Sequence, residues 1–287
     1  MTAGGELDLR PITTADVGGV AAFLRAELNG RLSVETWAAA IVPPWPVEAP
    51  NHGFLLAAGD RIVGVQLAVY SERLIMGRPE RICNLAAWCV IEEYRIHGVR
   101  LLRSALAQPG YTFTDLSPSG NVLEVNRRLR FTEFDTRSVL LPNVPKLGRS
   151  SIDVTGSDAA LAGTLTGDDL RHYQDHRGCL AARQVLIRSG TEHCHVIYRK
   201  DRRKGISAFA SILYASDPEL LQRALPDFRS YLIRRDRLMA TLAEIRLVGH
   251  PNGAVDLPET RRKMFRSDRL DADQLDYLYS ELTCVPW

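Results

Sequence analysis

Long apolar segments are missing from this 287-residue sequence. A membrane-spanning helix needs about 20 consecutive apolar residues, and no run in the chain approaches that length. The first residues also lack a basic region followed by an apolar core, so we expect no signal peptide. Both absences predict a protein that neither crosses nor binds a membrane.

Cysteine is scarce and shows no pairing pattern. The chain has five cysteines, with no C-x-x-C spacing among them. An odd number without such spacing is typical of a protein from a reducing compartment, with no disulfide framework. We therefore expect a soluble cytoplasmic protein.

A surplus of charge is lacking as well. The net charge of +2 and the hydrophobic content of 45% are those of an ordinary soluble globular protein. A surface that binds nucleic acid would show a cluster of basic residues, so we expect no nucleic-acid partner.

A standard metal-binding pattern is also absent. His172 and His176 lie four residues apart, with Cys179 nearby, and these residue types can bind zinc. Their spacing matches no standard zinc pattern, however, and the adjacent Asp175 and Arg177 favour a solvent-exposed helix. We therefore expect no metal site.

The length and the turn residues predict two domains of about 140 residues each. Residues 142–148 contain two prolines and a glycine, and they form the predicted boundary between residues 1–145 and residues 146–287. The predicted order within residues 7–141 is strand, two helices, β-hairpin, long strand, turn, helix, strand, helix and strand.

The segment 82–116 is the most informative part of the chain. Residues 82–91 have the length and apolar character of a buried strand, a charged turn spans 92–98, and 99–106 has helical spacing. A strand that turns into a helix leaves several backbone N–H groups free at one point, and the helix dipole adds positive charge there. This arrangement suits a phosphate group.

The turn resembles the acetyl-coenzyme A loop of the GNAT acyltransferase superfamily. That loop typically reads valine, two residues, glutamate, an aromatic residue, and then Arg/Gln-x-x-Gly-x-Gly/Ala before a helix. The matching residues here are Glu93, Tyr94, Arg95, Gly98 and Val99. The order of elements in residues 7–141 is similar too. The resemblance implies an α/β fold with a mixed, mostly antiparallel sheet flanked by helices, and acyl-coenzyme A as co-substrate.

The resemblance also implies where the cofactor would be held. Main-chain groups at the end of the strand would bind the pantetheine arm, and those of the turn would face the pyrophosphate, with one arginine adding charge. The thioester end would enter near residues 117–121. The candidate cofactor-binding residues are Cys89, Val90, Arg95, Ile96, His97, Gly98, Val99, Arg100 and Asn121.

Two positions depart from the family pattern. Arg100 stands at the motif's final glycine or alanine, where its side chain could clash with the pyrophosphate or bind it. Asn126 stands where family members often have the tyrosine that protonates the leaving thiolate. Asparagine can donate a hydrogen bond to a thiolate but gives up no proton, so we consider Asn126 and Ser119 as catalytic candidates.

The second half repeats a strand–helix–strand unit without the phosphate-type turn. A strand is expected over 206–215 and a helix over 219–234, kinked or interrupted at Pro226. The connecting turn is Asp217-Pro218, in which the carboxylate would repel a phosphate and the proline lacks an N–H. We expect a degenerate GNAT-like domain that closes the acceptor site or forms the surface of a homodimer.

The resemblance therefore implies an acyl-coenzyme A-dependent N-acyltransferase, with acetyl-coenzyme A as the expected donor and a small-molecule amine as the expected acceptor. The amine would attack the thioester carbonyl directly, helped by orientation and carbonyl polarisation. One alternative is a regulatory or scaffolding protein that binds coenzyme A without turnover. Another is that neither half binds a cofactor.

Overall fold

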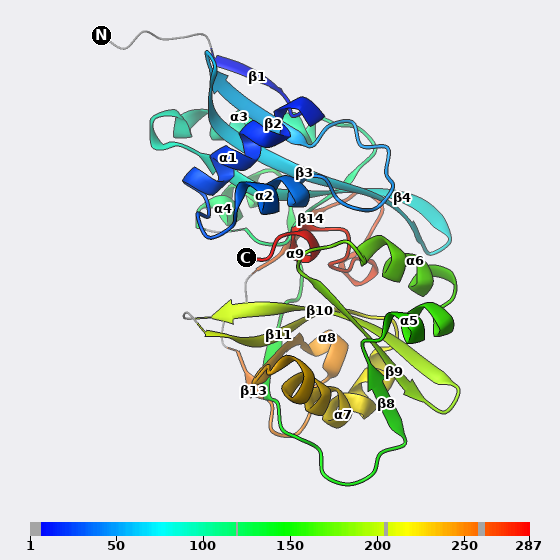
Figure 1. Cartoon of the computed structure of the whole chain (residues 1–287). Coiled ribbons are helices and arrows are strands. Elements are labelled where there is room, and N and C mark those ends of the chain that lie inside the picture. Colours follow the sequence, from blue (N-terminus) through cyan, green and yellow to red (C-terminus); the bar gives the residue numbers. More distant parts are fainter. Residues whose placement is uncertain (1–6, 119, 204–205, 258–261) are drawn as a thin grey trace. The chain divides into compact units, whose positions relative to one another are not determined.

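The computed structural model describes residues 7–118, 120–203, 206–257 and 262–287, which form two compact units (Figure 1). The first unit takes residues 1–134, 262–275 and 279–285, and the second takes 135–261, 276–278 and 286–287. The unit changes at residue 134, ahead of the boundary predicted after residue 145, because the strand that follows pairs within the second sheet. The C-terminal region returns to the first unit.

The described residues of the first unit form a seven-stranded sheet in which only one neighbouring pair is parallel, β4 with β5. In sheet order the strands are β1 (Leu7–Pro11), β2 (Gly53–Ala58), β3 (Arg61–Ile75), β4 (Arg78–Val90), β5 (Thr112–Asp115), β14 (Met264–Arg266) and β6 (Thr132–Glu133). Its helices are η1 (Thr14–Asp16), α1 (Val17–Glu27), α2 (Val34–Ile41), η2 (Glu92–His97), α3 (Gly98–Leu106), α4 (Val122–Arg128), η3 (Ala272–Gln274) and α9 (Glu281–Cys284).

Gly53 opens β2 at a point where no side chain fits. Its φ angle is +111°, and a Cβ there would lie 2.1 Å from the carbonyl oxygen of Gln66 on the paired strand β3. Only glycine allows this backbone conformation and this close approach. The β2–β3 hairpin therefore depends on a single residue type at its start.

Strand β4 bends just before its end. The pairing with β3 shifts between Ala86 and Cys89, and Ala87 has a positive φ of 46°, which marks a β-bulge. The buried Gln66 amide fixes the bulge, because its Nε2 donates to the carbonyl oxygen of Ala86 at 3.0 Å. On the other side, β4 pairs with β5 only over 82–85, so residues 86–90 have no partner on β5.

The second unit is also built on a seven-stranded sheet with one parallel pair, β11 with β12. In sheet order the strands are β8 (Ile152–Thr155), β9 (Ala182–Ser189), β10 (Glu192–Arg203), β11 (Ile206–Ala215), β12 (Ala240–Glu244), β7 (Ser138–Pro142) and β13 (Val255–Asp256). Its helices are α5 (Asp158–Thr164), α6 (Gly167–His176), α7 (Pro218–Asp236) and α8 (Ile245–Val248).

The two sheets share one strand order. In each, a four-strand antiparallel meander is followed by a parallel fifth strand, and the sixth position is filled by a strand from elsewhere in the chain. This strand is β14 in the first sheet and β7 in the second. The predicted fold class, two α/β halves with mixed, mostly antiparallel sheets flanked by helices, is confirmed.

Three details differ from the sequence prediction. The last strand of the order predicted for residues 7–141 is two strands, β6 and β7, and they belong to different sheets. The second strand of the predicted strand–helix–strand unit is β12, which ends at Glu244 and continues directly as α8. Helix α7 runs past Pro226 without interruption, with Asp217 capping its start through a 2.8 Å hydrogen bond from the Leu220 N–H. Within the described part of the chain, no helix combines the length and apolarity that a membrane span requires.

Candidate functional site

The predicted phosphate turn is a short 3₁₀ helix that leads directly into α3. This helix, η2, spans Glu92–His97, and α3 begins at Gly98. The N–H of Tyr94 donates to the carbonyl oxygen of Ile91 at 3.0 Å, and the N–H of Gly98 donates to that of Arg95. Two amides of the turn are therefore engaged within the chain. The binding of a cofactor by the turn remains a prediction.

The side chains of the turn face mainly outward. Ile96 is 85% exposed, and Arg95 and Arg100 are exposed as well. Arg95 forms an ion pair with Glu92, one turn earlier in η2. Arg100 lies in the first turn of α3, so its charge is close to the helix N-terminus.

Gly98 is buried for reasons of packing. Its φ angle of −56° is an ordinary helical value that any residue can adopt. A Cβ would lie 3.4 Å from the side chains of both Trp88 and Val90 on β4. The glycine thus brings the start of α3 close to the end of β4. His97 and Val99 on either side are partly exposed.

Cys89 and Val90 lie on the last part of β4, after the bulge. They pair with Val65 and Gly64 of β3 and are partly exposed. Because the pairing of β4 with β5 ends at Leu85, the opposite edge of β4 has no strand partner on β5 at these residues. Burial raises the pKa of the Cys89 thiol to about 11, which keeps it protonated and unreactive near neutral pH.

Of the two predicted catalytic residues, Asn126 and Ser119, the structure describes only Asn126. Asn126 is fully buried on α4, and its Nδ2 donates to Oδ2 of Asp115 at 2.8 Å. Its amide group thus holds a carboxyl group at the end of β5. Asn121 is exposed at the start of α4, and its side chain makes no capping hydrogen bond. Ser119 lies outside the described residues.

The end of β5 also holds a carboxyl group that the sequence did not indicate. Glu281, the first residue of α9, is completely buried, and its Oε1 accepts a hydrogen bond of 2.8 Å from the Ser117 hydroxyl. The backbone of Ser117 in turn hydrogen-bonds the carboxylate of Asp115. Ser117 therefore connects two buried carboxyl groups, and it is itself partly exposed.

Both carboxyl groups have a raised pKa. Burial raises the pKa of Asp115 to about 6, against the opposing effect of the Asn126 hydrogen bond. Burial also raises the pKa of Glu281 to about 7, and the nearby negative charge of Asp115 raises it further. These groups change protonation near neutral pH, the range in which a proton acceptor for catalysis works best.

Residues of the first unit hold Glu281 in place. Its N–H donates to Oδ1 of Asn84 at 3.0 Å, and the Asn84 Nδ2 donates to the Thr114 hydroxyl on β5 at 3.1 Å. Two residues earlier, Tyr279 has a left-handed φ of 56° and stacks edge-on against Trp45 with ring centroids 5.1 Å apart. Asn84 therefore ties the C-terminal segment to both β4 and β5.

Two tryptophans of the first unit, Trp37 on α2 and Trp45 in the loop before β2, are buried packing residues. Trp37 has no exposed surface, and Trp45 is 4% exposed. The indole N–H of Trp45 donates to the carbonyl oxygen of Tyr70 at 2.8 Å. Trp45 thus anchors the loop before β2 to strand β3. Among the described residues, no group of three or more His, Cys, Asp or Glu is placed to hold a metal ion.

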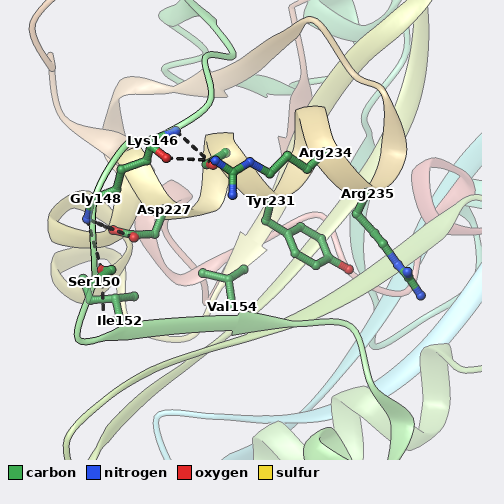
Figure 2. Close-up of a pocket in the computed structure, with 10 residues that line it drawn as sticks. Lys146, Gly148, Ser150, Ile152, Val154, Asp227, Tyr231, Arg234 and Arg235 are labelled. Atoms are coloured by element: carbon green, nitrogen blue, oxygen red, sulfur yellow. Dashed lines mark hydrogen bonds and ion pairs between the residues drawn. The ribbon is translucent and has the colours of Figure 1, made fainter.

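A hollow lies within the second unit, between α7 and the segment that leads into β8 (Figure 2). It has a volume of about 390 Å³. Lys146 donates to both carboxylate oxygens of Asp227, at 2.9 and 2.7 Å, and Arg234 donates to the Lys146 carbonyl at 2.9 Å. Figure 2 shows these polar groups at one end and Tyr231 at the other. The ion pair joins α7 to the segment before β8, a structural role.

We expect Asp227→Asn to lower the free energy of unfolding by roughly 1–3 kcal/mol, because it removes the charge of a largely buried carboxylate that accepts hydrogen bonds from Lys146. Asp227 has only 8% of its side chain exposed. The matched control is Asp153→Asn, which weakens the exposed pair with Arg188 and should cost less than about 1 kcal/mol. Urea unfolding measures both. Equal losses would contradict a structural role for the buried pair.

Comparisons with known proteins place this fold. No family model and no curated protein matches the sequence. Among solved structures, a GCN5-related N-acetyltransferase from Anabaena variabilis ATCC 29413 has a TM-score of 0.59 at 11% identity, over 91% of this chain and 72% of that one. One from Kribbella flavida has a TM-score of 0.57 at 18% identity, over 92% and 71%.

A further match extends over nearly the whole of both chains. A candidate acetyltransferase from Pyrococcus horikoshii has a TM-score of 0.57 at 12% identity, over 99% of this chain and 95% of that one. At these identities the similarity is one of fold. The chain thus has the fold of the GCN5-related N-acetyltransferases, in a tandem of two such halves.

Proposed function

We propose that the protein is an acyl-coenzyme A-dependent N-acyltransferase, with acetyl-coenzyme A as donor and a small-molecule amine as acceptor. The observation that carries the proposal is the end of β4, which bulges at Ala87 and loses its partner β5 beyond Leu85. Just before the bulge, Leu85 pairs with Asp115 and the Asn84 side chain accepts from the N–H of Glu281, and both of these acidic residues are buried. The acyltransferase fold of the chain supports the same reaction.

The residues at this point fit such a donor. Main-chain groups of Cys89 and Val90 would hold the pantetheine arm along the β4 edge that faces no β5 partner. Arg100, exposed in the first turn of α3, would bind a phosphate together with the positive end of the helix. When bound, acyl-coenzyme A supplies an activated thioester. The chain orients its carbonyl carbon toward the amine and removes the proton that the amine releases.

Arg100→Glu is expected to weaken coenzyme A binding at least about tenfold, or about 1.4 kcal/mol, because it reverses a charge beside the phosphates. The matched control is Arg103→Glu, an exposed residue in the last turn of the same short helix, which should change the affinity little. Isothermal titration calorimetry with coenzyme A measures both. Equal affinities would place the phosphates elsewhere.

Turnover is tested separately from binding. Release of free thiol would be measured with acetyl-coenzyme A and longer acyl donors against a panel of amines. Thiol release that depends on an amine supports the proposal. Tight coenzyme A binding without thiol release for any acceptor would instead indicate the alternative, a regulatory or scaffolding protein that keeps the site without the reaction.

A further inference from the structure

The hydroxyl of Ser117 is the point where a buried acid meets the partly exposed end of β5. Glu281 has no exposed surface, whereas Ser117 is partly exposed and donates to Glu281 Oε1 at 2.8 Å. A fully buried carboxyl group cannot touch a substrate. It can exchange a proton with one only through a hydrogen-bonded neighbour, and Ser117 is that neighbour.

The surroundings of Glu281 leave one of its carboxyl oxygens without a hydrogen bond from a described residue. Its backbone N–H is held by Asn84 at 3.0 Å, but its Oε2 accepts no hydrogen bond from the residues that the structure describes. An ionised carboxylate in a purely structural role is usually paired with a cation or with several donors. The carboxyl group of Glu281 takes hydrogen bonds from Ser117 and Asn84, no cation is among the described groups that shift its pKa, and a second carboxyl group, Asp115, lies nearby.

We propose that Glu281 takes up, through the Ser117 hydroxyl, the proton that the acceptor amine loses during acyl transfer. This inference rests on the proposed function. It makes Ser117 the group that contacts the amine and Glu281 a positioning residue that acts through it. It also gives the C-terminal segment 279–285 a part in the chemistry of the first unit.

The proton and electron movements balance. The amine nitrogen adds to the thioester carbonyl carbon, and a C–N bond forms. One N–H proton passes to Ser117 Oγ while the hydroxyl proton of Ser117 passes to Glu281 Oε1. The C–S bond then breaks with its electron pair remaining on sulfur, which takes a proton from water. Glu281 returns its proton to water through Ser117 before the next turnover.

The neighbouring groups set the pH at which this can occur. Asp115 on β5 is the ionisable group that raises the pKa of Glu281, in addition to burial, while the hydrogen bonds from Ser117 and Asn84 lower it. Asn126 on α4 donates to Asp115 and favours its charged form. With a pKa of about 7, Glu281 accepts protons above neutral pH.

The test compares the pH dependence of kcat/KM for the wild type and for Glu281→Gln with one amine. Because both share that amine, the ratio of the two profiles cancels its ionisation. We expect the wild-type advantage to grow with pH, to level off above pH 7, and to reach about 10²-fold, the usual contribution of a general base. The KM for acyl-coenzyme A should stay within about twofold, since Glu281 has no part in holding the donor.

Three variants separate the proposed path from a loss of structure. Ser117→Ala should show the same loss as Glu281→Gln, and Ser117→Thr, which keeps the hydroxyl, should restore activity. Glu124→Gln, an exposed glutamate on α4, serves as the control and should behave as the wild type. Infrared difference spectroscopy gives a readout without turnover: a carboxyl band that titrates near pH 7 should disappear in Glu281→Gln.

The outcomes distinguish the two proposals. If the wild type transfers acyl groups but the profile ratio is flat, the proton path is wrong and the function stands. If the wild type releases no thiol with any amine, the proposed function fails and the proton path fails with it. If Ser117→Ala keeps full activity, Ser117 is not the connection.

Discussion

Replacing Phe265 with proline is expected to unfold the first unit under conditions in which the wild type is folded. Phe265 is the middle residue of β14, and it pairs with Thr114 of β5 on one side and with Thr132 of β6 on the other. Proline lacks the N–H that this position needs and is confined to edge strands and bulges. The substitution also removes a buried ring that packs against Phe134 with centroids 4.9 Å apart.

The expected cost is of the same order as the stability of a whole domain. Losing a buried aromatic side chain costs about 3–5 kcal/mol, and the strand disruption adds to it, whereas a domain is stable by about 5–15 kcal/mol. Tryptophan fluorescence reports on this unit, because it contains Trp37, Trp45 and Trp88, and only Trp287 lies in the second. The matched control is Phe265→Leu, which keeps the N–H and should lose about 1 kcal/mol. A proline variant with an unchanged urea midpoint would show that β14 is dispensable.

The position of β14 could not be read from the sequence. It has three residues, too few for an alternating pattern, and its partners on β5 and β6 lie far away in the chain. By contrast, the β2–β3 hairpin was predicted correctly, because its two strands and the turn at Gly59 follow one another directly in the sequence. Local elements could be predicted where the pattern and the turn residues agreed. Pairing between distant segments could not.

The same limit applies to the candidate site. The strand, turn and helix at 82–106 were placed correctly, because their apolar spacing and Gly98 are close in sequence. The hydrogen bond from Asn126 to Asp115 could not be predicted, because no local pattern joins these two residues. Glu281 lies 164 residues from Ser117, and no spacing motif joins two such positions. Its burial results from the return of the C-terminal region to the first unit.

Wild-type stability is expected to fall as the pH rises from about 5 to 8, and Glu281→Gln should remove much of that fall. The folded-state pKa of Glu281 is about 7, above the ordinary value of 4.5 for a glutamate. Between these two values the unfolded chain releases a proton that the folded protein retains, so rising pH favours unfolding. The loss begins above the unfolded pKa and is complete above the folded one. It amounts to about 3 kcal/mol at about 1.4 kcal/mol per pKa unit.

Asp115 acts in the same direction over a lower pH window. Its pKa is raised from 3.8 to about 6 by burial, so its share of the loss is complete before that of Glu281. Urea unfolding of the wild type, Glu281→Gln and Asp115→Asn at half-unit pH steps resolves the two windows. Glu281→Gln should be close to the wild type at pH 5 and more stable than it at pH 8. Parallel profiles would mean that Glu281 titrates normally.

A double variant that combines Asp115→Asn with Glu281→Gln tests whether the two carboxyl groups interact. The charge of Asp115 is one of the two causes that raise the pKa of Glu281, so Asp115→Asn should move the remaining transition to lower pH. The stabilisation at pH 8 from removing both acids should then be smaller than the sum of the single effects, because removing either charge relieves the repulsion between them. If the stabilisation at pH 8 by the double variant equals the sum of the two single effects, burial alone raises the two pKa values. Ser117 would then connect two acids that titrate independently.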